Sequence, residues 1–308
     1  MENEYTALVE QLQGQVLYLA PDSQSYLNPM DLDLSTDVGE SPMLMQADFL
    51  LSQCELMMAS YGNPLMPIEK SLIDRCISLV YRDYLKRPTP ENMPILGDLY
   101  QCLRAQDNHT ADDLATAMEI YVTGSLSYLN HRTNVDLNNR LVCYNTSKMG
   151  QGLKKLVMAN VQKHIWQRTT INRYAGVTTR IFLDEFHMLL KEPQTAAYTA
   201  EIYKRFRKWN GIPTSLTQNV KDLLASPEIE NILENSDFIL MLNQGASDRG
   251  ILAQRLGISP QELTHVTNSG EGEGLLFFGD KIIPFVDKFP RDTQLYRVMT
   301  TKPSDLAA

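Results

Sequence analysis

The sequence predicts an α/β protein with a mostly parallel sheet, an inserted all-helical segment and a C-terminal β-hairpin. From residue 140 onward, short apolar runs alternate with amphipathic helical stretches, which is the pattern of a parallel sheet. Between about residues 43 and 132, apolar residues recur at helical spacing only. Two apolar runs around Gly279–Asp280 add the hairpin.

Composition and length fit this class. The 308 residues are 43% hydrophobic and 21% charged, ordinary values for a globular protein, which argues against disorder or a disulfide scaffold. No apolar run approaches the roughly 18 residues that a membrane span needs. The four cysteines lie far apart without a C-x-x-C pair, which favours reduced thiols and a cytoplasmic protein.

The charge is unevenly distributed. The net charge is −9, but residues 1–139 carry a net −13 and residues 140–308 a net +4. Within 140–209 there are 13 basic and 4 acidic residues. The net charge argues against a simple nucleic-acid binder. The asymmetry predicts two lobes with different surfaces and a local rather than global site for polyanions.

The first part of the chain is predicted to be mainly helical. Residues 15–19 form an apolar run typical of a buried strand, and Asn28–Asp31 has the composition of a turn. Gly39 and Pro42 mark residues 36–42 as a linker. Helices are then expected over 43–60, 68–85, 95–105 and 111–121.

The second part of the chain is predicted to alternate between strands and helices. Strands are expected over 141–144, 178–183, 212–216 and 238–242. Helices are expected over 150–172, 194–209, 228–234, 246–256 and 260–266, the last with Ser259 as its N-cap. Strands 275–278 and 281–286 would form the closing hairpin.

The sharpest candidate for a site is the acidic pair Asp184–Glu185, which follows the apolar strand Arg180–Leu183. In open α/β sheets, ligands bind beyond the carboxyl ends of the strands. An Asp at that place can hold Mg²⁺, and a Glu beside it can polarise a water for attack on a γ-phosphate. The alternative is a strand that ends in acidic residues only because they are solvated.

Two further segments have both a functional and a structural interpretation. Gln218 follows the next strand, where it could sense a γ-phosphate; the alternative is a cap for the helical stretch after Asn219. The spacing of the basic run Lys204–Lys208 favours a solvated helix face. The alternative is an arginine finger offered to the phosphates of a neighbouring subunit.

Other motifs are weaker. Ser269–Gly274 is rich in glycine, but it leads into a strand and carries two carboxylates, so a turn is a better interpretation than a phosphate loop. The five histidines have no metal-ligand spacing, and His187 has no partner in the sequence. No G-x-S-x-G motif is present, which excludes a serine-hydrolase elbow.

Several segments, taken in order, resemble one family. They are Glu2–Tyr5, Gly14–Val16, Asn28–Asp31, Ile181–His187, Thr217–Val220 with Leu223–Leu224, Gly274–Leu276, Pro284–Phe285 and Leu295–Tyr296. Together they are similar to the C-terminal motor domain of the VirB-type conjugation and type IV secretion ATPases, the TraE/TrbE/CagE group of the FtsK–HerA branch of P-loop NTPases. The resemblance covers nearly the whole chain.

This resemblance implies a RecA-like core interrupted by a helical lobe. The implied division is residues 1–35 as the first part of the core, 36–138 as the lobe and 139–308 as the rest of the core. It also implies a cytoplasmic ATPase at the inner face of the cell membrane, a hexamer that uses ATP and Mg²⁺. The implied partners are channel proteins and a coupling ATPase of the secretion machinery, and DNA.

The resemblance also assigns roles to individual residues. Asp184 would be the Walker B residue that contacts the nucleotide-bound Mg²⁺, Glu185 the catalytic carboxylate and Gln218 the sensor. Arg207 is the first candidate for an arginine finger, and Arg205 is the second. These roles describe hydrolysis of ATP in the service of DNA transfer or protein secretion.

One departure from the family is plain. The family carries a G-x-x-x-x-G-K-[ST] motif before the Glu2–Tyr5 segment, and no such run occurs in the 308 residues. The resemblance therefore implies a chain that starts downstream of this motif, with unpaired sheet edges. Two alternatives to a motor remain open, a non-catalytic assembly module and a related DNA translocase with residues 140–209 along its DNA channel.

Overall fold

The computed structural model describes residues 5–34, 41–59, 64–191, 193–218, 220–224 and 226–300. The chain forms two compact units, residues 1–171 and 172–308. Most of the predicted linker at 36–42 lies outside the described residues. None of the helices in the described ranges combines the length and apolarity that a membrane span requires.

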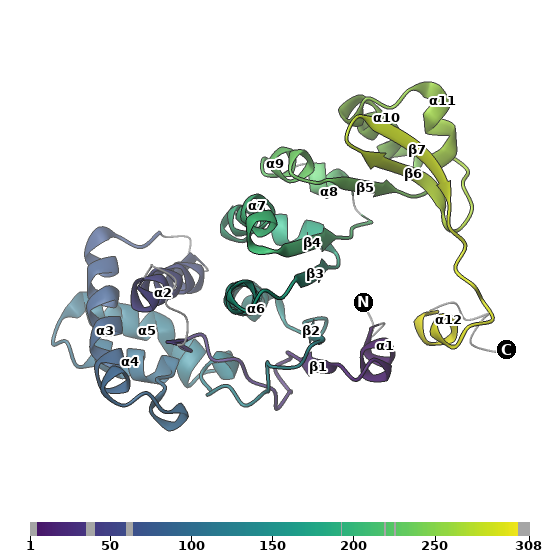
Figure 1. Cartoon of the computed structure of the whole chain (residues 1–308). Helices are drawn as coiled ribbons and strands as arrows, with labels where there is room; N and C mark the ends of the chain where they lie inside the picture. The colour runs from purple at the N-terminus through teal and green to yellow at the C-terminus, as the bar shows by residue number, and fades with distance from the viewer. Residues whose placement is uncertain are drawn as a thin grey trace. The chain divides into compact units, whose positions relative to one another are not determined.

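A two-stranded parallel sheet in the first unit joins segments far apart in the sequence. Strand β1 (Gln15–Tyr18), which follows the short helix α1 (Thr6–Gln11), pairs with β2 (Val142–Asn145). The helices between residues 42 and 129 therefore interrupt the chain between two paired strands (Figure 1). The domain boundaries expected at 35 and 138 stay a prediction.

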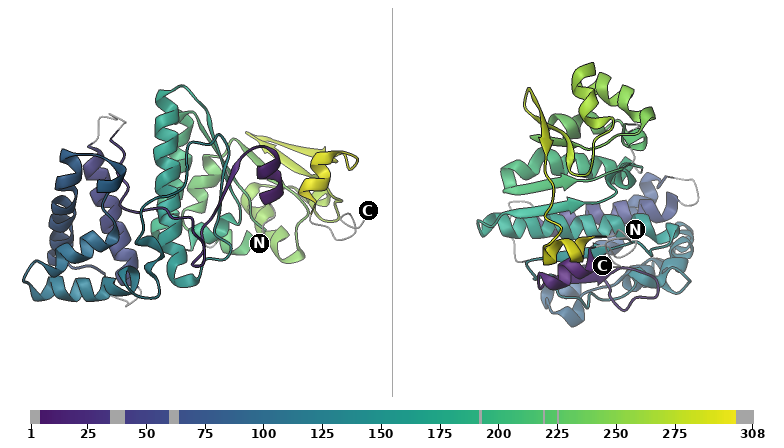
Figure 2. Two further views of the ribbon diagram at one scale, coloured as in Figure 1. Left: turned by 90° about the horizontal axis from the view of Figure 1, so that it is seen from below. Right: turned by 90° about the vertical axis from the view of Figure 1, so that its right-hand side faces the viewer.

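The predicted helices of this unit are confirmed, with ends shifted by one or two residues. Figures 1 and 2 show the purple-to-blue helices packed as a bundle. The apolar core of this unit includes Leu50, Ile73 and Leu99. The helical elements are α2 (Pro42–Ala59), α3 (Pro67–Lys86), η1 (Pro90–Asn92), α4 (Leu96–Arg104), α5 (His109–Val122), η2 (Ser127–Leu129) and α6 (Gln151–Tyr174). The methionine- and leucine-rich pattern of residues 43–132 thus encodes a helix bundle.

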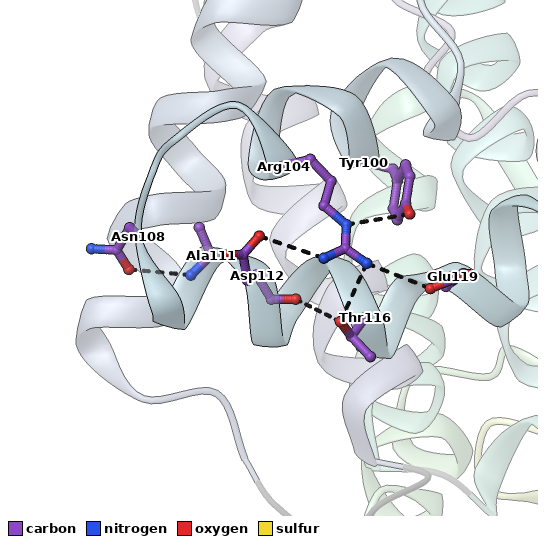
Figure 3. Close-up of polar contacts among 7 residues, drawn as sticks. All are labelled: Tyr100, Arg104, Asn108, Ala111, Asp112, Thr116 and Glu119. Atoms are coloured by element: carbon purple, nitrogen blue, oxygen red, sulfur yellow. Dashed lines mark hydrogen bonds and ion pairs between the residues drawn. The ribbon is translucent and has the colours of Figure 1, made fainter.

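Arg104 links α4 to α5 on the surface of this bundle. Its guanidinium lies 3.5 Å from Asp112 Oδ1 and from Glu119 Oε2, and 3.4 Å from Thr116 Oγ1 (Figure 3). Its Nε also donates to the hydroxyl of Tyr100, one turn earlier in α4. The start of α5 is capped in the same view by Asn108, whose Oδ1 accepts a hydrogen bond from the Ala111 amide at 3.2 Å.

A buried lysine of α6 holds the loop after β1. Lys163 Nζ donates to the backbone oxygens of Pro29, at 3.0 Å, and Asp31, at 2.6 Å, and lies 4.7 Å from the centroid of the Phe49 ring. Burial lowers the pKa of Lys163 to about 7. Burial also raises the pKa of the Asp31 carboxyl, although Thr133 Oγ1 donates a hydrogen bond to it. The Asn28–Asp31 segment is therefore a fixed, buried turn.

Side chains from the lobe complete this Lys163 cluster, which comprises Lys163, the 28–31 turn and the groups that bind the turn. Tyr81 of α3 donates to the backbone oxygen of Met30, and Gln46 of α2 donates to the Tyr81 hydroxyl at 2.9 Å. Asn28 Nδ2 donates to the backbone oxygen of Pro94 at 2.7 Å. The turn is thus joined to α2, α3 and α6 by hydrogen bonds that satisfy buried polar groups.

The second unit contains two sheets. Strand β3 (Thr179–Leu183) pairs in parallel with β4 (Gly211–Ser215), as the alternating pattern predicts. Strand β5 (Phe238–Met241) instead runs antiparallel to β6 (Glu273–Phe278), which forms the predicted hairpin with β7 (Lys281–Val286). The expected parallel pairing is therefore confirmed for β1–β2 and β3–β4, while β5 belongs to an antiparallel sheet (Figure 1).

The helices of the second unit follow the predicted order. Ser259 is the N-cap expected for α11: its Oγ accepts from the Glu262 amide at 3.3 Å, and the Glu262 carboxylate accepts from the Ser259 amide at 2.8 Å. The short helix α12 was not predicted. The helical elements are η3 (Phe186–Leu190), α7 (Pro193–Phe206), η4 (Arg207–Trp209), α8 (Val220–Leu224), α9 (Ile229–Glu234), α10 (Ala246–Leu256), α11 (Pro260–Leu263), η5 (Thr264–Val266) and α12 (Gln294–Met299).

Each sheet of this unit has one packed and one exposed face. Met241 and Leu275 pack with residues of α8 and α10 in a small apolar core. The alternate positions Phe182, Phe238 and Leu240 are 68%, 61% and 64% exposed. Parallel strands are usually covered on both faces, so the side of β3 that exposes Arg180 and Phe182 is available to a further segment.

Gly272 closes the base of the hairpin, and its replacement tests the fold. A Cβ there would lie 2.0 Å from the backbone oxygen of Asp287, at a φ of +70°. We expect Gly272→Ala to lower the free energy of unfolding by about 2–4 kcal/mol. Gly279 has a φ of +59° but open space around it, so Gly279→Ala should lose only about 1 kcal/mol. Denaturant titration followed by Trp209 fluorescence in a Trp166→Phe background measures both, and equal losses would contradict the prediction.

Candidate functional site

The carboxyl ends of β3 and β4 lie side by side. Leu183 is opposite Ser215 in the parallel register. The backbone pairing continues past the strands, because the Leu216 amide donates to the Leu183 oxygen and the Phe186 amide donates to the Leu216 oxygen, both at 2.9 Å. This pairing brings the segment after β3 against the segment after β4, so the acidic pair and the predicted sensor follow neighbouring strands at one edge.

The acidic pair occupies a sharp turn between β3 and η3. Asp184 Oδ1 accepts a hydrogen bond from the Glu185 amide at 2.8 Å. Glu185 has φ +46° and ψ +45°, in the left-handed region that side chains other than Gly, Asn and Asp rarely adopt. Both residues are half-buried. Backbone conformations of this kind cost about 1–3 kcal/mol and cluster at functional sites. Gln13, Asp107 and Asn210 share the positive φ, but among them only Glu185 follows a strand end with a neighbouring carboxylate.

His187 connects this turn to the segment after β4. Its Nδ1 lies 3.1 Å from Glu185 Oε2 and 3.0 Å from Thr217 Oγ1. The sequence alone gives His187 no partner. The only signal available was its position two residues after Glu185, because Thr217 is 30 residues away and becomes a neighbour only through the β3–β4 pairing.

Gln218 lies immediately after Thr217 and is exposed at the same edge of the ladder. The helix α8 begins at Val220, so the segment after β4 leads into a helix, as the capping alternative expected. The sensor role of Gln218 stays a prediction.

The two arginines lie at the other end of the strands. Arg205 is in the last turn of α7, where its Nε forms an ion pair with Glu201. Arg207 is exposed in η4, which precedes the amino end of β4. In a parallel ladder the amino ends lie at the edge opposite the carboxyl ends, so one copy of the chain does not bring Arg205 or Arg207 to Asp184. The finger role of both arginines stays a prediction.

The donor set fits a magnesium ion that is completed by substrate. Across the residues that the structure describes, no group of three or more His, Cys, Asp or Glu side chains could hold a metal ion. Mg²⁺ is commonly bound by one or two carboxylates together with phosphate oxygens and waters. The single carboxylate of Asp184 at the strand end has the chemistry of such a ligand.

The glycine-rich segment is structural. The Gly270 amide donates to the Glu273 carboxylate at 2.9 Å, and Lys288 Nζ lies 3.2 Å from the same carboxylate. The Asp287 amide donates to the Gly272 oxygen at 2.7 Å. The residues before β6 therefore close the hairpin, and the turn predicted for Ser269–Gly274 is the better interpretation.

Parallel strands joined by a helix, with carboxylates after the first strand, are features of the RecA-like P-loop NTPase fold, which the comparisons identify in this chain. The family model of the TraG P-loop domain matches residues 98–269, more than half of the chain. The chain belongs to this family.

Comparison with solved structures supports the same fold. VirB4 of Thermoanaerobacter pseudethanolicus is similar with a TM-score of 0.77 and 24% identity, over 94% of this chain and 80% of that chain. The plasmid coupling protein TrwB in complex with the GTP analogue GDPNP is similar with a TM-score of 0.54 and 12% identity, over 91% and 76%. TrwB in complex with ADP and Mg²⁺ gives a TM-score of 0.53 at the same identity and coverage. The comparison with curated proteins finds no match.

Proposed function

We propose that this chain is the ATPase motor domain of a conjugation or type IV secretion machine. The observation that carries the proposal is the paired carboxyl edge of β3 and β4, which holds Asp184 and a left-handed Glu185 next to Thr217 and Gln218. Membership of the TraG P-loop domain family supports it, as does the likeness of fold to VirB4 and TrwB.

In this function Asp184 binds the Mg²⁺ of the nucleotide, and Glu185 orients and polarises the attacking water. Bound Mg²⁺ neutralises charge on the β- and γ-phosphates during transfer. Gln218, exposed beside Thr217, contacts the γ-phosphate. The crystallised complexes of TrwB with GDPNP and with ADP and Mg²⁺ support ATP and Mg²⁺ as the ligands.

The phosphates also need a G-x-x-x-x-G-K-[ST] segment, which the 308 residues do not contain. We propose that a strand–loop–helix segment bearing this motif completes the site. Phe182 of β3, and Phe238 and Leu240 of β5, are exposed apolar side chains on strands that such a segment can cover. A nucleotide site built in this way would combine the motif with the acidic pair.

The arginines fit a role between subunits. Because Arg207 lies at the opposite edge from Asp184, it can serve only the site of a neighbouring copy, which supports a ring such as a hexamer. Arg205, paired with Glu201, is the second candidate. We propose that the ring acts at the inner face of the cell membrane with channel proteins and a coupling ATPase.

Mg²⁺-dependent nucleotide binding tests the proposal. The reading frame upstream of residue 1 is sequenced, and the chain is prepared both as printed and extended through any G-x-x-x-x-G-K-[ST] motif found there. A fluorescent ATP analogue should bind the extended chain more tightly with Mg²⁺ than with EDTA. Asp184→Asn should weaken the Mg²⁺-dependent part of binding by roughly tenfold to a hundredfold. Asp237→Asn, a change at an exposed carboxylate in the same unit, should not.

The alternative function is a non-catalytic assembly module, and the missing motif favours it. If the upstream frame holds no P-loop, the chain should bind no nucleotide and should co-purify with secretion-channel proteins. A DNA translocase would show DNA binding that falls steeply with salt, because phosphate contacts release counterions. Salt-independent or absent DNA binding would exclude the translocase.

A further inference from the structure

One imidazole nitrogen lies within hydrogen-bond distance of two segments. His187 Nδ1 lies between the carboxylate of Glu185, at 3.1 Å, and the hydroxyl of Thr217, at 3.0 Å. The His187 side chain is 10% exposed. Phe186 and Leu189, which flank it in η3, are 2% and 4% exposed, so the turn that carries His187 is anchored in the core. The contact is therefore made by a fixed donor on a buried turn.

The chemistry of the three groups determines where the proton lies. A carboxylate can only accept a hydrogen bond, whereas a hydroxyl oxygen can accept or donate. The 3.1 Å approach to Glu185 Oε2 is therefore favourable only if Nδ1 carries a hydrogen. The Nδ1–H group can then be shared with Thr217 Oγ1. A ring protonated only at Nε2 would place a lone pair against the carboxylate.

We propose that His187 is a positioning residue that holds the Glu185 carboxylate against the segment after β4. The inference rests on the catalytic role proposed for Glu185. One carboxylate oxygen is engaged by Nδ1–H, which restricts rotation of the side chain and leaves the other oxygen for water. Because Thr217 directly precedes Gln218, the same ring links the catalytic carboxylate to the predicted sensor.

A merely structural histidine would fill the same space, and its loss would not change how the Glu185 carboxylate acts on the substrate. Backbone contacts already join the two segments, since the Phe186 amide donates to the Leu216 oxygen. Loss of the imidazole should therefore leave the β3–β4 pairing intact while freeing the Glu185 side chain. A tautomer measurement and a kinetic measurement distinguish the two roles.

The first test is ¹⁵N NMR of the histidine ring nitrogens in the 308-residue chain. The His187 signals are assigned by their loss in His187→Asn. Nδ1 should be protonated in the unmodified chain, and its signal should shift in Glu185→Gln and in Thr217→Val. His131, whose Nδ1 lies 3.2 Å from the Tyr128 oxygen in the other unit, is the internal control and should not respond. A ring protonated only at Nε2 would overturn the proposal.

The second test is the steady-state kinetics of ATP hydrolysis by the chain supplied with a segment that carries the G-x-x-x-x-G-K-[ST] motif. His187→Leu should lower kcat by roughly 10²-fold with little change in KM, the scale expected when a catalytic group is misplaced by about 1 Å. His187→Asn should recover most of the rate, because its amide can donate from near the position of Nδ1. Equal losses in both variants would overturn the positioning role. If Glu185→Gln itself left turnover unchanged, the catalytic role proposed for Glu185 would be wrong. The NMR result would still show whether His187 Nδ1 donates a hydrogen bond to the Glu185 carboxylate.

Discussion

Replacing Glu185 with Gln is expected to lower ATP turnover by about 10²–10⁴-fold, the range for removal of a general base. The substitution keeps the size of the side chain and removes its charge. Glu185 lies outside the expected phosphate-binding loop, so affinity for a fluorescent ATP analogue should stay within about twofold of the parent. Phosphate release and equilibrium binding, measured on the same extended chain, separate the two effects.

The left-handed backbone at Glu185 offers a control that a simple loss of folding cannot imitate. Gly accepts a φ of +46° without strain, so Glu185→Gly should be as inactive as Glu185→Gln yet no less stable than the parent. An exposed carboxylate elsewhere in the unit, Glu234, provides the matched substitution, and Glu234→Gln should keep full turnover. Turnover in Glu185→Gln equal to that of Glu234→Gln would refute the catalytic assignment.

The candidate site was partly predictable because the information for Asp184 and Glu185 is local. An apolar run followed by two carboxylates indicates a strand end, and the β3–β4 pairing placed Gln218 at the same edge. The contact of His187 with Thr217 was not predictable in this way. It depends on the register between strands whose paired residues are 32 positions apart, and no local pattern specifies that register.

The difference between local and long-range information also explains which parts of the fold were predictable. Long helices such as α3 and α6 show many turns of apolar periodicity, so their existence and approximate ends were predictable. The helices α1 and α12 have six residues each, too few for the period to be detected. The antiparallel partner of β5 was missed because an apolar run does not encode the direction of its neighbour.

The burial of Lys163 is a further feature that was not predicted from the sequence. A lysine in the middle of a helix is normally assigned to the solvated face, and sequence reasoning gave it no role. Here its ammonium group meets two backbone oxygens of the 28–31 turn. Those oxygens come from a loop more than 130 residues earlier, so the burial of the charge is visible only in the tertiary structure.

This burial predicts that the first unit becomes more stable as the pH rises from 7 to 9. Burial lowers the pKa of Lys163 to about 7 in the folded state, while the unfolded chain keeps the ordinary value of 10.5. Between these values the unfolded state binds more protons, so the free energy of unfolding increases with pH. From pH 7 to pH 9 the gain should be about 2 kcal/mol, and below pH 7 the contribution of Lys163 should level off.

Neighbouring groups do not produce this slope. Burial, and to a smaller extent the charge of Lys163, lowers the pKa of His164 to about 3. The effect of His164 on the free energy of unfolding therefore no longer changes with pH above its unfolded pKa of 6.5. Burial raises the pKa of Cys54 to about 12, which opposes stability only above the unfolded value of 9.0. Burial also raises the pKa of Asp31 above its unfolded value of 3.8. The contribution of the protonated Asp31 to stability is therefore lost as the pH rises from 3.8 through the folded pKa. An Asp31→Asn background removes that opposing slope.

The measurement uses the two tryptophans of the chain. In a Trp209→Phe background, Trp166 is the sole reporter and lies in α6, one turn from Lys163. Urea unfolding at pH 7, 8 and 9 should show the increase in the parent and in Lys155→Met, a change at an exposed lysine of the same helix. Lys163→Met, whatever its absolute stability, should lose the increase, because it has no proton to release. A slope in Lys163→Met as steep as in the parent would show that the Lys163 ammonium is not the group that titrates.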